Sequence, residues 1–397
     1  MTKKWVNIAD VLFFQEGPGV RNTQYTTSGV KLLNVANLVD GKVDLSKSDR
    51  YISEEEAYGK YRHFLCDDGD FVIASSGIKV EYIDKKMGFV DASMLPLCMN
   101  TSTIRFKVLD ENQLRIRYFM YYLKSKHFKE QLTKQITGSA QLNYGPSHLK
   151  KMIMPLIDIT VQDEIISCMD KLQSIIETRQ RELIELDRLM KARFVELFGD
   201  PRSNPFGFEK KRLKDTCKVI TGNTPSRAIA EYYGDYIEWI KTDNIVSGIL
   251  NPTQATESLS EKGMNVGRTV EKDSILMACI AGSIASIGRV CITDRTVGFN
   301  QQINAVVPEQ YNILFLYVLF QMSKDYLVED INMALKGILS KSKLEEKEFI
   351  IPPMDLQEQF SDFVKQVNKS KFDTMTFAPI YAIINLYLHT YFYQGRR

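Results

Sequence analysis

The segment QDEIISCMDKLQSIIETRQRELIELDRLMKARFVELF, residues 162–198, sets the organisation of this chain. It contains neither proline nor glycine, and Gly-Asp-Pro at residues 199–201 follows it, as is typical of a helix end. Apolar side chains recur along it at alternating spacings of four and three residues, with Arg179 and Arg193 at two of the positions. The apolar positions are Ile165, Met169, Leu172, Ile176, Leu183, Leu186, Met190 and Leu197. This spacing predicts a rod about 55 Å long with a coiled-coil seam that needs a partner helix.

The segments on the two sides of this helix resemble each other, which indicates a duplicated chain. Three pairs recur in the same order: LLNVANLVDG (32–41) with WIKTDNIVSG (239–248), GDFVIA (69–74) with KDSILMA (272–278), and MPLIDITVQ (154–162) with IPPMDLQEQ (351–359). The alignments pair Asn37 with Asn244, Gly41 with Gly248, Asp70 with Asp273, Pro155 with Pro352 and Gln162 with Gln359. The separations of 207, 203 and 197 residues drift as small insertions and deletions would make them. Chance similarity between β-rich segments is the alternative, and it does not explain the shared order.

Each copy mixes short apolar runs with turn residues, as expected of a domain that has both strands and helices. Residues 71–76, 102–109 and 275–281 have strand patterns, whereas residues 116–134 and 313–328 have helical patterns. The predicted fold class is α/β (α+β), with two tandem globular domains joined by long antiparallel coiled-coil helices. The predicted segments are a first domain at 1–158, a spacer helix at 159–200, a second domain at 201–355 and a second helical spacer at 356–397.

The second spacer has a poorer seam than the first. Lys369, Ser370 and Lys371 interrupt its apolar pattern, and Pro379 is expected to end or kink the helix. The uncharged run that follows favours a renewed helix at about residues 380–392, and it is too short for a membrane span. Antiparallel pairing of the two spacers would relate the domains by a pseudo-two-fold axis. The alternative for the first spacer is an ordinary amphipathic helix that lies on one domain.

Overall charge says little about partners, because 51 basic and 49 acidic residues leave a net charge of +2. A nucleic-acid interface must therefore rest on local charge. Residues 115–151 contain eight basic residues and one acid, Glu130, which makes them a candidate phosphate-binding patch. The six cysteines and four histidines show no metal-ligand spacing, so no metal site is expected. With no secretory signal at the N-terminus, we interpret the cysteines as reduced core residues of a cytoplasmic protein.

Candidate DNA contacts gather in glycine-rich loops at matching places of the two copies. Base edges are recognised by Asn, Gln, Arg, Lys, Ser and Thr side chains on exposed turns, and glycine lets a backbone approach phosphate. In the first copy the candidates are Arg21, Asn22, Gln24, Tyr25, Ser75, Ser76, Lys79, Gln141 and Asn143. In the second copy they are Thr221, Asn223, Thr224, Ser226, Arg227, Lys241, Asn300 and Gln301. Two unlike surfaces spaced by about one DNA turn, near 34 Å, predict a split target with unequal halves.

Nearly the whole chain resembles the specificity subunits of type I restriction-modification enzymes, which have two target-recognition domains in tandem and long helical spacers. The resemblance is carried by GPGVRNTQY (17–25), LLNVANLVDG (32–41), GDFVIASSG (69–77), MPLIDITVQDEI (154–165), FGDP (198–201), TGNTPS (221–226), WIKTDNI (239–245), GFNQQINAV (298–306) and IPPMDLQEQ (351–359). Residues 375–395 depart from the family pattern, because they keep the expected length but lose the charged heptads.

The resemblance implies a DNA-reading function without a catalytic site in this chain. Each domain would read one half of an asymmetric double-stranded DNA site through the major groove. Two methyltransferase subunits would dock on the helices and flip adenine out for N6 methylation, and restriction subunits would translocate DNA. No cofactor or metal is expected on this chain, whereas S-adenosylmethionine, ATP and Mg are expected on the partner subunits. No membrane partner is expected.

Two other functions fit parts of the sequence. A stand-alone methyltransferase or nuclease is disfavoured, because Pro352–Pro353 lacks the flanking residues of an adenine-methyltransferase motif and residues 282–289 do not form a P-loop. Glu209 and Lys211 resemble part of a nuclease motif, but they follow the helix in a charged linker. A coiled-coil scaffold that binds only protein is the other alternative, and the doubled set of polar loops argues against it.

Overall fold

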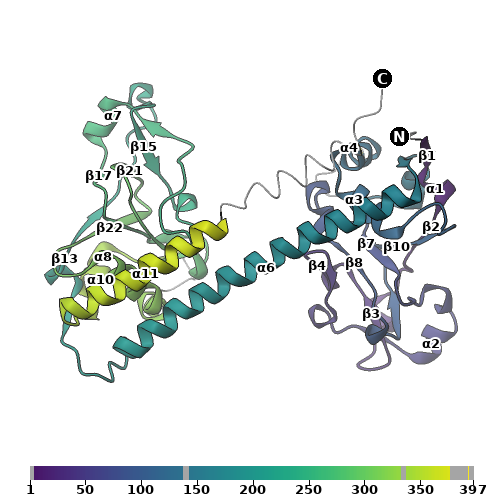
Figure 1. Ribbon diagram of the computed structural model, residues 1–397, viewed down its shortest axis with the longest axis horizontal. Coiled ribbons are helices and arrows are strands. Elements are labelled where there is room, and N and C mark those ends of the chain that lie inside the picture. Colours follow the sequence, from purple (N-terminus) through teal and green to yellow (C-terminus); the bar gives the residue numbers. More distant parts are fainter. Residues whose placement is uncertain (1–3, 137–142, 332–336, 376–391, 393–397) are drawn as a thin grey trace. The chain divides into compact units, whose positions relative to one another are not determined.

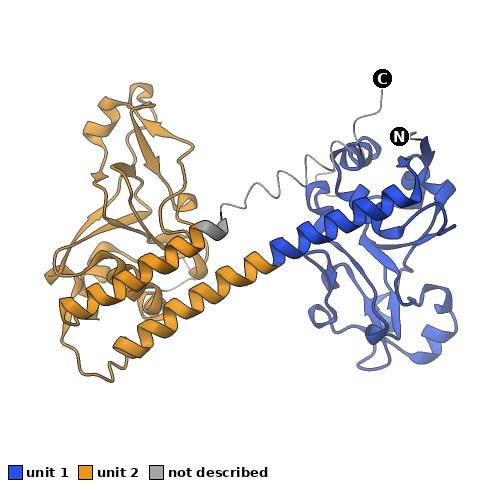
Figure 2. Cartoon of the chain, viewed as in Figure 1, with its two compact units in different colours: residues 1–177, 378–397 blue, residues 178–377 orange. Residues whose placement is uncertain are grey.

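The chain folds into two compact units, and the boundary between them lies inside one long helix (Figures 1 and 2). The computed structural model describes residues 4–136, 143–331, 337–375 and 392. Unit 1 comprises Met1–Glu177 with Ala378–Arg397, and unit 2 comprises Thr178–Phe377. The long helix, α6 (Ile159–Phe198), contributes its first part to unit 1 and its second part to unit 2. The helix predicted at residues 162–198 is therefore confirmed.

The central sheet of unit 1 is antiparallel, with the strand order β2-β10-β7-β8. Its strands are β2 (Leu12–Glu16), β10 (Thr103–Val108), β7 (Phe71–Ala74) and β8 (Met87–Phe89). Helices α3 (Ile116–Lys124) and α4 (Lys126–Gln135) pack against it, and the ring of Phe119 lies 5.0 Å from that of Phe106. The single helix predicted at 116–134 is thus two helices. Ser125 causes the break, because its side chain accepts a hydrogen bond from the Phe128 amide and begins α4.

A second sheet of unit 1 has β3 (Val30–Leu33) between β6 (Tyr51–Ile52) and β9 (Leu97–Met99). Strand β3 runs parallel to β9, a pairing that brings distant parts of the sequence together. Two strand pairs complete the unit: β1 (Lys4–Asn7) with β11 (Ile153–Leu156), and β4 (Leu38–Val39) with β5 (Lys42–Val43). The short helices are α1 (Ile8–Val11), α2 (Glu54–Tyr58) and α5 (Pro146–Leu149).

Unit 2 repeats this topology. Its central sheet has the order β13-β22-β18-β20, formed by β13 (Cys217–Thr221), β22 (Ile303–Pro308), β18 (Ile275–Ala278) and β20 (Val290–Ile292). In the second sheet β15 (Ile237–Ile240) runs parallel to β21 (Val297–Phe299), flanked by β14 (Tyr233–Gly234), β16 (Ser258–Leu259) and β17 (Thr269–Val270). The remaining strand pairs are β12 (Lys210–Arg212) with β24 (Glu348–Ile350), and β19 (Ile280–Ala281) with β23 (Gly337–Ile338).

The helices of unit 2 also differ in detail from the prediction. The helix expected at 313–328 is divided at Ser323 into α8 (Ile313–Met322) and α9 (Lys324–Val328). Two short helices, α7 (Glu261–Val266) and α10 (Lys341–Glu346), precede and follow them. The strand expected at 275–281 is likewise divided into β18 and β19. The amides of Cys279 and Ile280 both bond to the Gln302 carbonyl, so the register with β22 is lost there, and β19 pairs with β23 instead.

The duplication is confirmed, and the hydrogen bonds correct its register at two places. The Asn37 side chain accepts from the Asn34 amide just as Asn244 accepts from the Lys241 amide, so the separation of 207 is right. Strands β7 and β18 are equivalent at a separation of 204 residues, not 203. The counterpart of Asp70 in the repeat is therefore Ser274 rather than Asp273. At the start of the two long helices the separation is 195, not 197.

The Gln162 side chain fixes this last register. It accepts a hydrogen bond from the Arg115 amide and donates to the Ile157 carbonyl. The Gln357 side chain makes the same pair of bonds with the Asn312 amide and the Pro352 carbonyl. The counterpart of Gln162 is therefore Gln357 and not Gln359, because the side chain that satisfies the backbone, rather than the flanking proline, marks the equivalent position.

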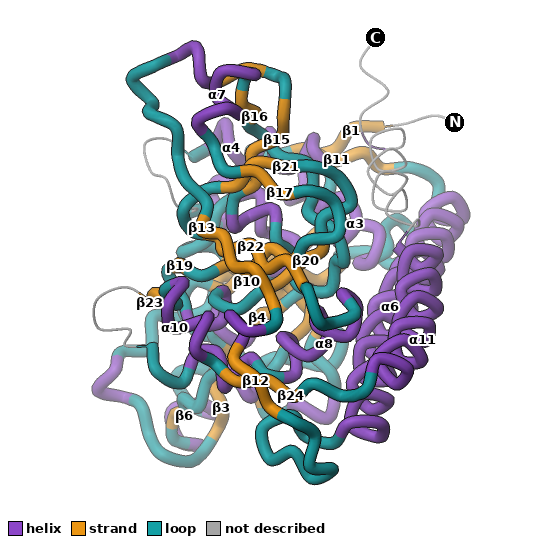
Figure 3. Tube along the Cα trace, turned by 90° about the vertical axis from the view of Figure 1, so that its left-hand side faces the viewer, coloured by secondary structure: helices purple, strands orange, loops and turns teal. Residues whose placement is uncertain are grey.

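Within unit 2, the second part of α6 packs antiparallel against α11 (Met354–Met375). Figure 3 shows the two helices side by side. Asp187 forms an ion pair with Lys371 near one end, and Phe194 contacts Phe360 near the other. The buried positions here are Met190, Phe194 and Phe198, with a four-residue spacing that departs from the predicted seam. The two phenylalanines enter the core of the unit, so this end of α6 is a domain helix as well as a spacer.

The C-terminal segment was expected to bend at Pro379 and to form a helix at about 380–392, and all of it except Phe392 lies outside the described residues. Phe392 is fully buried in unit 1, with its ring centroid 5.4 Å from those of Tyr118 and Tyr122. This contact gives unit 1 a core residue from the far end of the sequence.

The cysteines are free thiols. Cys168 is half-buried and the others are buried. Burial raises the pKa of the thiols of Cys66, Cys98, Cys217, Cys279 and Cys291 to about 12. Such thiols stay protonated and unreactive at neutral pH. In the part of the chain that the structure describes, no group of His, Cys, Asp or Glu side chains is arranged to hold a metal ion, and no helix could cross a membrane.

Candidate nucleic-acid interface

Two glycine turns begin the polar loops of the two units. The Gly17 amide donates to the Thr103 carbonyl, and the Gly222 amide donates to the Ile303 carbonyl. A Cβ atom at either glycine would lie 2.1 Å from the backbone oxygen of Asn100 or Asn300, a distance that no side chain can adopt. Glycine is therefore required at both positions, and the loops that follow leave the same end of the equivalent sheets.

In unit 2 the loop after Gly222 packs around Trp239. The indole Nε1 donates to the Asn223 carbonyl at 3.3 Å. The Arg227 guanidinium lies over the rings of Tyr233 and Trp239, at 4.6 and 5.4 Å from their centroids, and the Lys241 ammonium lies 5.3 Å from the Trp239 centroid. Two predicted contacts, Arg227 and Lys241, are thus gathered on one aromatic platform.

Glu257 ties these two cations together. Its carboxylate accepts from Arg227 at 2.7 Å and also pairs with Lys241. The hydrogen bond from Lys241 is the main cause that lowers the pKa of Glu257. With the carboxylate ionised, this cluster carries a net single positive charge and holds both cations at the surface, where they can exchange Glu257 for phosphate.

The other predicted residues of unit 2 divide into exposed and framework groups. Thr224 donates to the Gln301 side chain, and both are exposed, as is Ser226. Asn300 is buried and bonds to Gln302, so it shapes the loop that presents Gln301. Asn223 and Thr221 are tied to the Val266 carbonyl and to the Asn304 side chain.

In unit 1 several predicted contacts hold the framework instead. Gln24 donates to Glu56 and Tyr61 and accepts from the Arg21 amide, so its amide is satisfied internally. Ser75 is buried, and its hydroxyl donates to Glu16. Ser76 donates to Ser102 and forms a β-bridge with Asn143. The prediction for Ser75 as a direct DNA contact does not fit this placement, because burial leaves its side chain no access to a duplex.

The remaining candidates of unit 1 are exposed or lie elsewhere. Arg21, Asn22 and Asn143 are exposed. Lys79 lines a separate cavity of about 380 Å³ with Tyr82 and other lysines. Gln141 lies outside the described residues. The structure thus gives unit 1 a polar face whose chemistry differs from that of unit 2.

Sequence reasoning missed Arg50 and Asn100 in unit 1. The Arg50 guanidinium lies 5.2 Å from the ring centroid of Tyr25, and Asn100 donates to Asn34 at 2.8 Å beside the Tyr25 hydroxyl. Asn100 is the counterpart of Asn300 in the repeat, so the duplication itself was the signal that could have found it. In unit 2, Trp239, Tyr233 and Glu257 were missed because the prediction there considered only Asn, Gln, Arg, Lys, Ser and Thr, the side chains that read base edges.

Four of the eight basic residues in the patch predicted at residues 115–151 form ion pairs. Arg115 pairs with Asp163, and Arg117 pairs with Asp170, both on α6. Lys129 pairs with Asp84, and Lys126 with Glu130. These four side chains are therefore ion-paired rather than free cations. The sequence does not show the pairing, because the acids that face them come mostly from distant parts of the chain.

We predict that Glu257→Gln strengthens binding to random-sequence DNA. Loss of the carboxylate frees Arg227 and Lys241 for phosphate, so the plot of log Kd against log salt should steepen by about 0.9 for each cation that gains a phosphate contact. Fluorescence anisotropy with a labelled duplex at several salt concentrations measures this. Glu261→Gln, which removes the same charge from an exposed position of α7, is the control. Equal effects of both variants would contradict the assigned role of Glu257.

The two units therefore share one domain design. In each, a glycine turn at the end of the central sheet begins a polar loop, and a second sheet lies beside that loop. A family model described as "Type I restriction modification DNA specificity domain" matches residues 18–188 and again residues 205–379. The chain belongs to this family and contains two copies of its domain.

Curated relatives agree with this assignment. The type I restriction enzyme HindI specificity subunit of Haemophilus influenzae is 33% identical over 146 residues, which cover 35% of this chain and 31% of that protein. The MjaIX specificity subunit of Methanocaldococcus jannaschii is 24% identical over 302 residues, covering 70% of this chain and 68% of that protein. The chain thus matches about a third of the first relative's length and about two thirds of the second's.

Solved structures share the fold. The S subunit of a type I restriction-modification system from M. genitalium superposes with a TM-score of 0.59 at 14% identity, covering 100% of this chain and 97% of that one. A chain from a study of complex assembly and conformational transition of the type I system gives 0.54 at 15% identity, covering 97% and 96%. At these identities the likeness establishes the fold alone.

Proposed function

We propose that this chain is the DNA-reading specificity subunit of a type I restriction-modification complex and that its two units read the two unequal halves of one target. The observation that carries the proposal is the pair of equivalent loops that start at Gly17 and Gly222 on matching sheets. They present different side chains, with Arg21, Asn22 and Tyr25 in one unit and Thr224, Ser226 and Arg227 in the other. Equivalent frames with unlike surfaces suit a site whose halves differ in sequence.

The long helix supports reading of a split site. With 40 residues, α6 is about 60 Å long at a rise of about 1.5 Å per residue, which exceeds one DNA turn of about 34 Å. We propose that α6 sets the separation of the half-sites and that residues 159–200 act as the spacer between the domains. A pseudo-two-fold relation between the units remains part of this proposal.

We propose that methyltransferase subunits dock on the helical region. In unit 2 an apolar groove of about 710 Å³ lies along α6, lined by Leu186, Leu189 and Ala192 between charged residues. Leu189 and Ile184 are each about half exposed, so this part of α6 offers apolar surface to a partner. Two such subunits would supply the methyl transfer, and restriction subunits would add the nuclease.

Catalysis is assigned to the partners rather than to this chain. S-adenosylmethionine, ATP and Mg would bind the methyltransferase and restriction subunits, and the complex would work on DNA in the cytoplasm. The rival proposal, a stand-alone DNA-modifying enzyme, predicts methyl transfer by the purified chain with S-adenosylmethionine and DNA. Methylation that needs the added methyltransferase subunits would exclude this rival.

The test of the function is a domain exchange. Replacing residues 1–155 with the equivalent segment of a relative should change one half of the methylated adenine motif and leave the other half as it was. Sequencing of methylated adenines in a genome that carries each version, with the methyltransferase subunits present, reads the motif directly. A change in both halves would contradict reading by separate domains. A motif that does not depend on the chain at all would favour a protein scaffold without DNA readout.

A further inference from the structure

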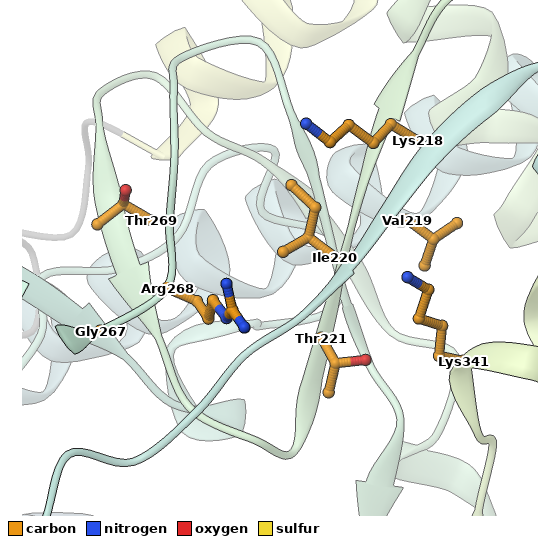
Figure 4. A pocket seen from close by; sticks show the side chains of 8 residues that line it. All are labelled: Lys218, Val219, Ile220, Thr221, Gly267, Arg268, Thr269 and Lys341. Atoms are coloured by element: carbon orange, nitrogen blue, oxygen red, sulfur yellow. The ribbon is translucent and has the colours of Figure 1, made fainter. Parts of the chain in front are cut away.

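Unit 2 contains a cationic cavity. Of the predicted DNA contacts, only Thr221 lines it. Its volume is about 520 Å³, and it is lined by Lys218, Val219, Ile220, Thr221, Gly267, Arg268, Thr269 and Lys341 (Figure 4). Three of these side chains are cations and none is acidic. The positive groups come from three separate elements: β13, the chain before β17, and the first position of α10.

The cations of this cavity are poorly neutralised. Lys341 has Glu345 at 3.5 Å, one turn along its own helix. Among the residues that the structure describes, no acidic oxygen lies within ion-pairing distance of Lys218 or Arg268. Figure 4 shows the Arg268 guanidinium beside Ile220 and Thr221, with Lys341 on the other side of the strand. The three cations border one cavity whose lining contains no acid, and guanidinium and ammonium groups are suited to phosphate.

The equivalent place in unit 1 has no such charge. The strand registers match Lys218 to Phe13 and Thr221 to Glu16. Thr269 of β17 pairs with Gly298 of β21, and Leu65 forms the equivalent bridge with Cys98. The residues that precede Thr269 and Leu65, Arg268 and Phe64, are therefore equivalent.

The separation of 195 residues matches Lys341 to Pro146. Three cations are therefore replaced by two aromatic rings and a proline, and the hydroxyl by an acid. The duplicated frame does not need the charges, so they serve something particular to unit 2.

The cavity adjoins the loop that carries the proposed base-reading residues. Thr221 lines it and immediately precedes Gly222, where that loop begins. The Asn223 side chain donates to the Val266 carbonyl at 2.9 Å, which holds the loop against the segment that leads to Arg268. A duplex seated on the loop would bring its sugar-phosphate backbone within reach of this cavity.

We propose that Lys218, Arg268 and Lys341 form a phosphate-binding site for the DNA backbone next to the half-site read by unit 2. This inference rests on the proposed DNA-reading function. The site adds affinity and fixes the position of the duplex, but it selects no base, because phosphates carry no sequence information. Unit 1 has no counterpart of it, so unit 2 makes the larger electrostatic contribution at this position of the frame.

The test uses the full chain assembled with its methyltransferase subunits and a duplex that contains the methylated motif. The triple variant Lys218→Gln, Arg268→Gln, Lys341→Gln should bind about 10- to 100-fold more weakly, with a salt dependence of log Kd that is shallower by about 0.9 per lost phosphate contact. The methylated motif should stay unchanged. Lys272→Gln is the control for the loss of one positive charge and is compared with Lys218→Gln, since Lys272 is exposed before β18, at the end of the sheet away from Gly222.

Inorganic phosphate distinguishes a DNA site from a site for a free anion. At constant ionic strength, replacing chloride by phosphate should weaken DNA binding of the wild type more than that of the triple variant. An unchanged salt dependence in the variant, or an altered motif, would overturn the inference.

Phosphate binding that leaves DNA affinity untouched would assign the cavity to a free anion instead and would also overturn it. A wild type without sequence-selective DNA binding would refute the proposed function itself, which is a different result. Because Lys218 is exposed on an edge strand, Lys218→Gln alone keeps the test valid if the triple variant does not fold.

Discussion

Phe360→Ala is expected to lower the free energy of unfolding of unit 2 by about 3–5 kcal/mol, the usual loss for a large aromatic side chain removed from a core. The Phe360 ring is fully buried where α6, α8 and α11 meet. Its centroid lies 5.5 Å from those of Phe194 and Phe198 and 6.4 Å from that of Phe315. Truncation leaves a cavity between three helices that are held apart by the other rings, so little of the lost contact can be recovered.

Urea unfolding followed by hydrogen-exchange mass spectrometry measures this effect for each unit separately. Phe372→Ala is the control on the same helix, because the Phe372 side chain is 67% exposed and its removal should change the free energy by less than about 0.5 kcal/mol. The loss should be confined to peptides of unit 2. Similar losses for Phe360→Ala and Phe372→Ala would contradict the packing described for α6 and α11.

Arg105→Met is expected to destabilise unit 1 by about 3–5 kcal/mol, because it leaves a buried carboxylate without its partner. Arg105 and Asp70 lie 3.2 Å apart, with side chains 9% and 2% exposed. The guanidinium also donates to the carbonyls of Leu65 and His63 and to the Gln15 side chain. The variant therefore leaves these three acceptors without their donor. Lys107 remains 3.3 Å from Asp70 and keeps the loss from being larger.

The matched control is Arg115→Met. Arg115 pairs with Asp163 at 2.8 Å, but both side chains are about half exposed, so solvent screens the pair and its loss should cost about 0–1 kcal/mol. Thermal unfolding monitored at unit 1 compares the two variants. If both lowered stability equally, burial would not be what makes the Arg105 interaction strong.

The long helix and the duplication could be predicted because both are local or repeated patterns. A run without proline or glycine predicts α6 directly, and two copies of a motif support each other. The register could not be fixed to the residue. Gln357, for example, is recognised as the partner of Gln162 only by the backbone groups that the two side chains bond. Two of these groups, the amides of Arg115 and Asn312, lie 47 and 45 residues away in sequence.

The candidate interface could be predicted only in part, because polar residues on loops have two uses. Arg227, Thr224 and Gln301 lie exposed together, whereas Gln24 and Ser75 hold the fold, and residue type alone does not separate these roles. Charge has the same difficulty. In the basic run that starts at Arg115, Asp163 and Asp170 pair with Arg115 and Arg117, and the sequence does not show that α6 brings these acids there.

The glycine turns have a consequence for how such a protein can evolve. Gly17 and Gly222 anchor each loop at a point where no other residue fits, while the residues after them are free of the sheet's ladder. New target preferences can therefore arise by rewriting a short insert while the supporting architecture is inherited intact. Since each unit has its own anchor and core, one half can acquire a new preference while the other half retains its old one.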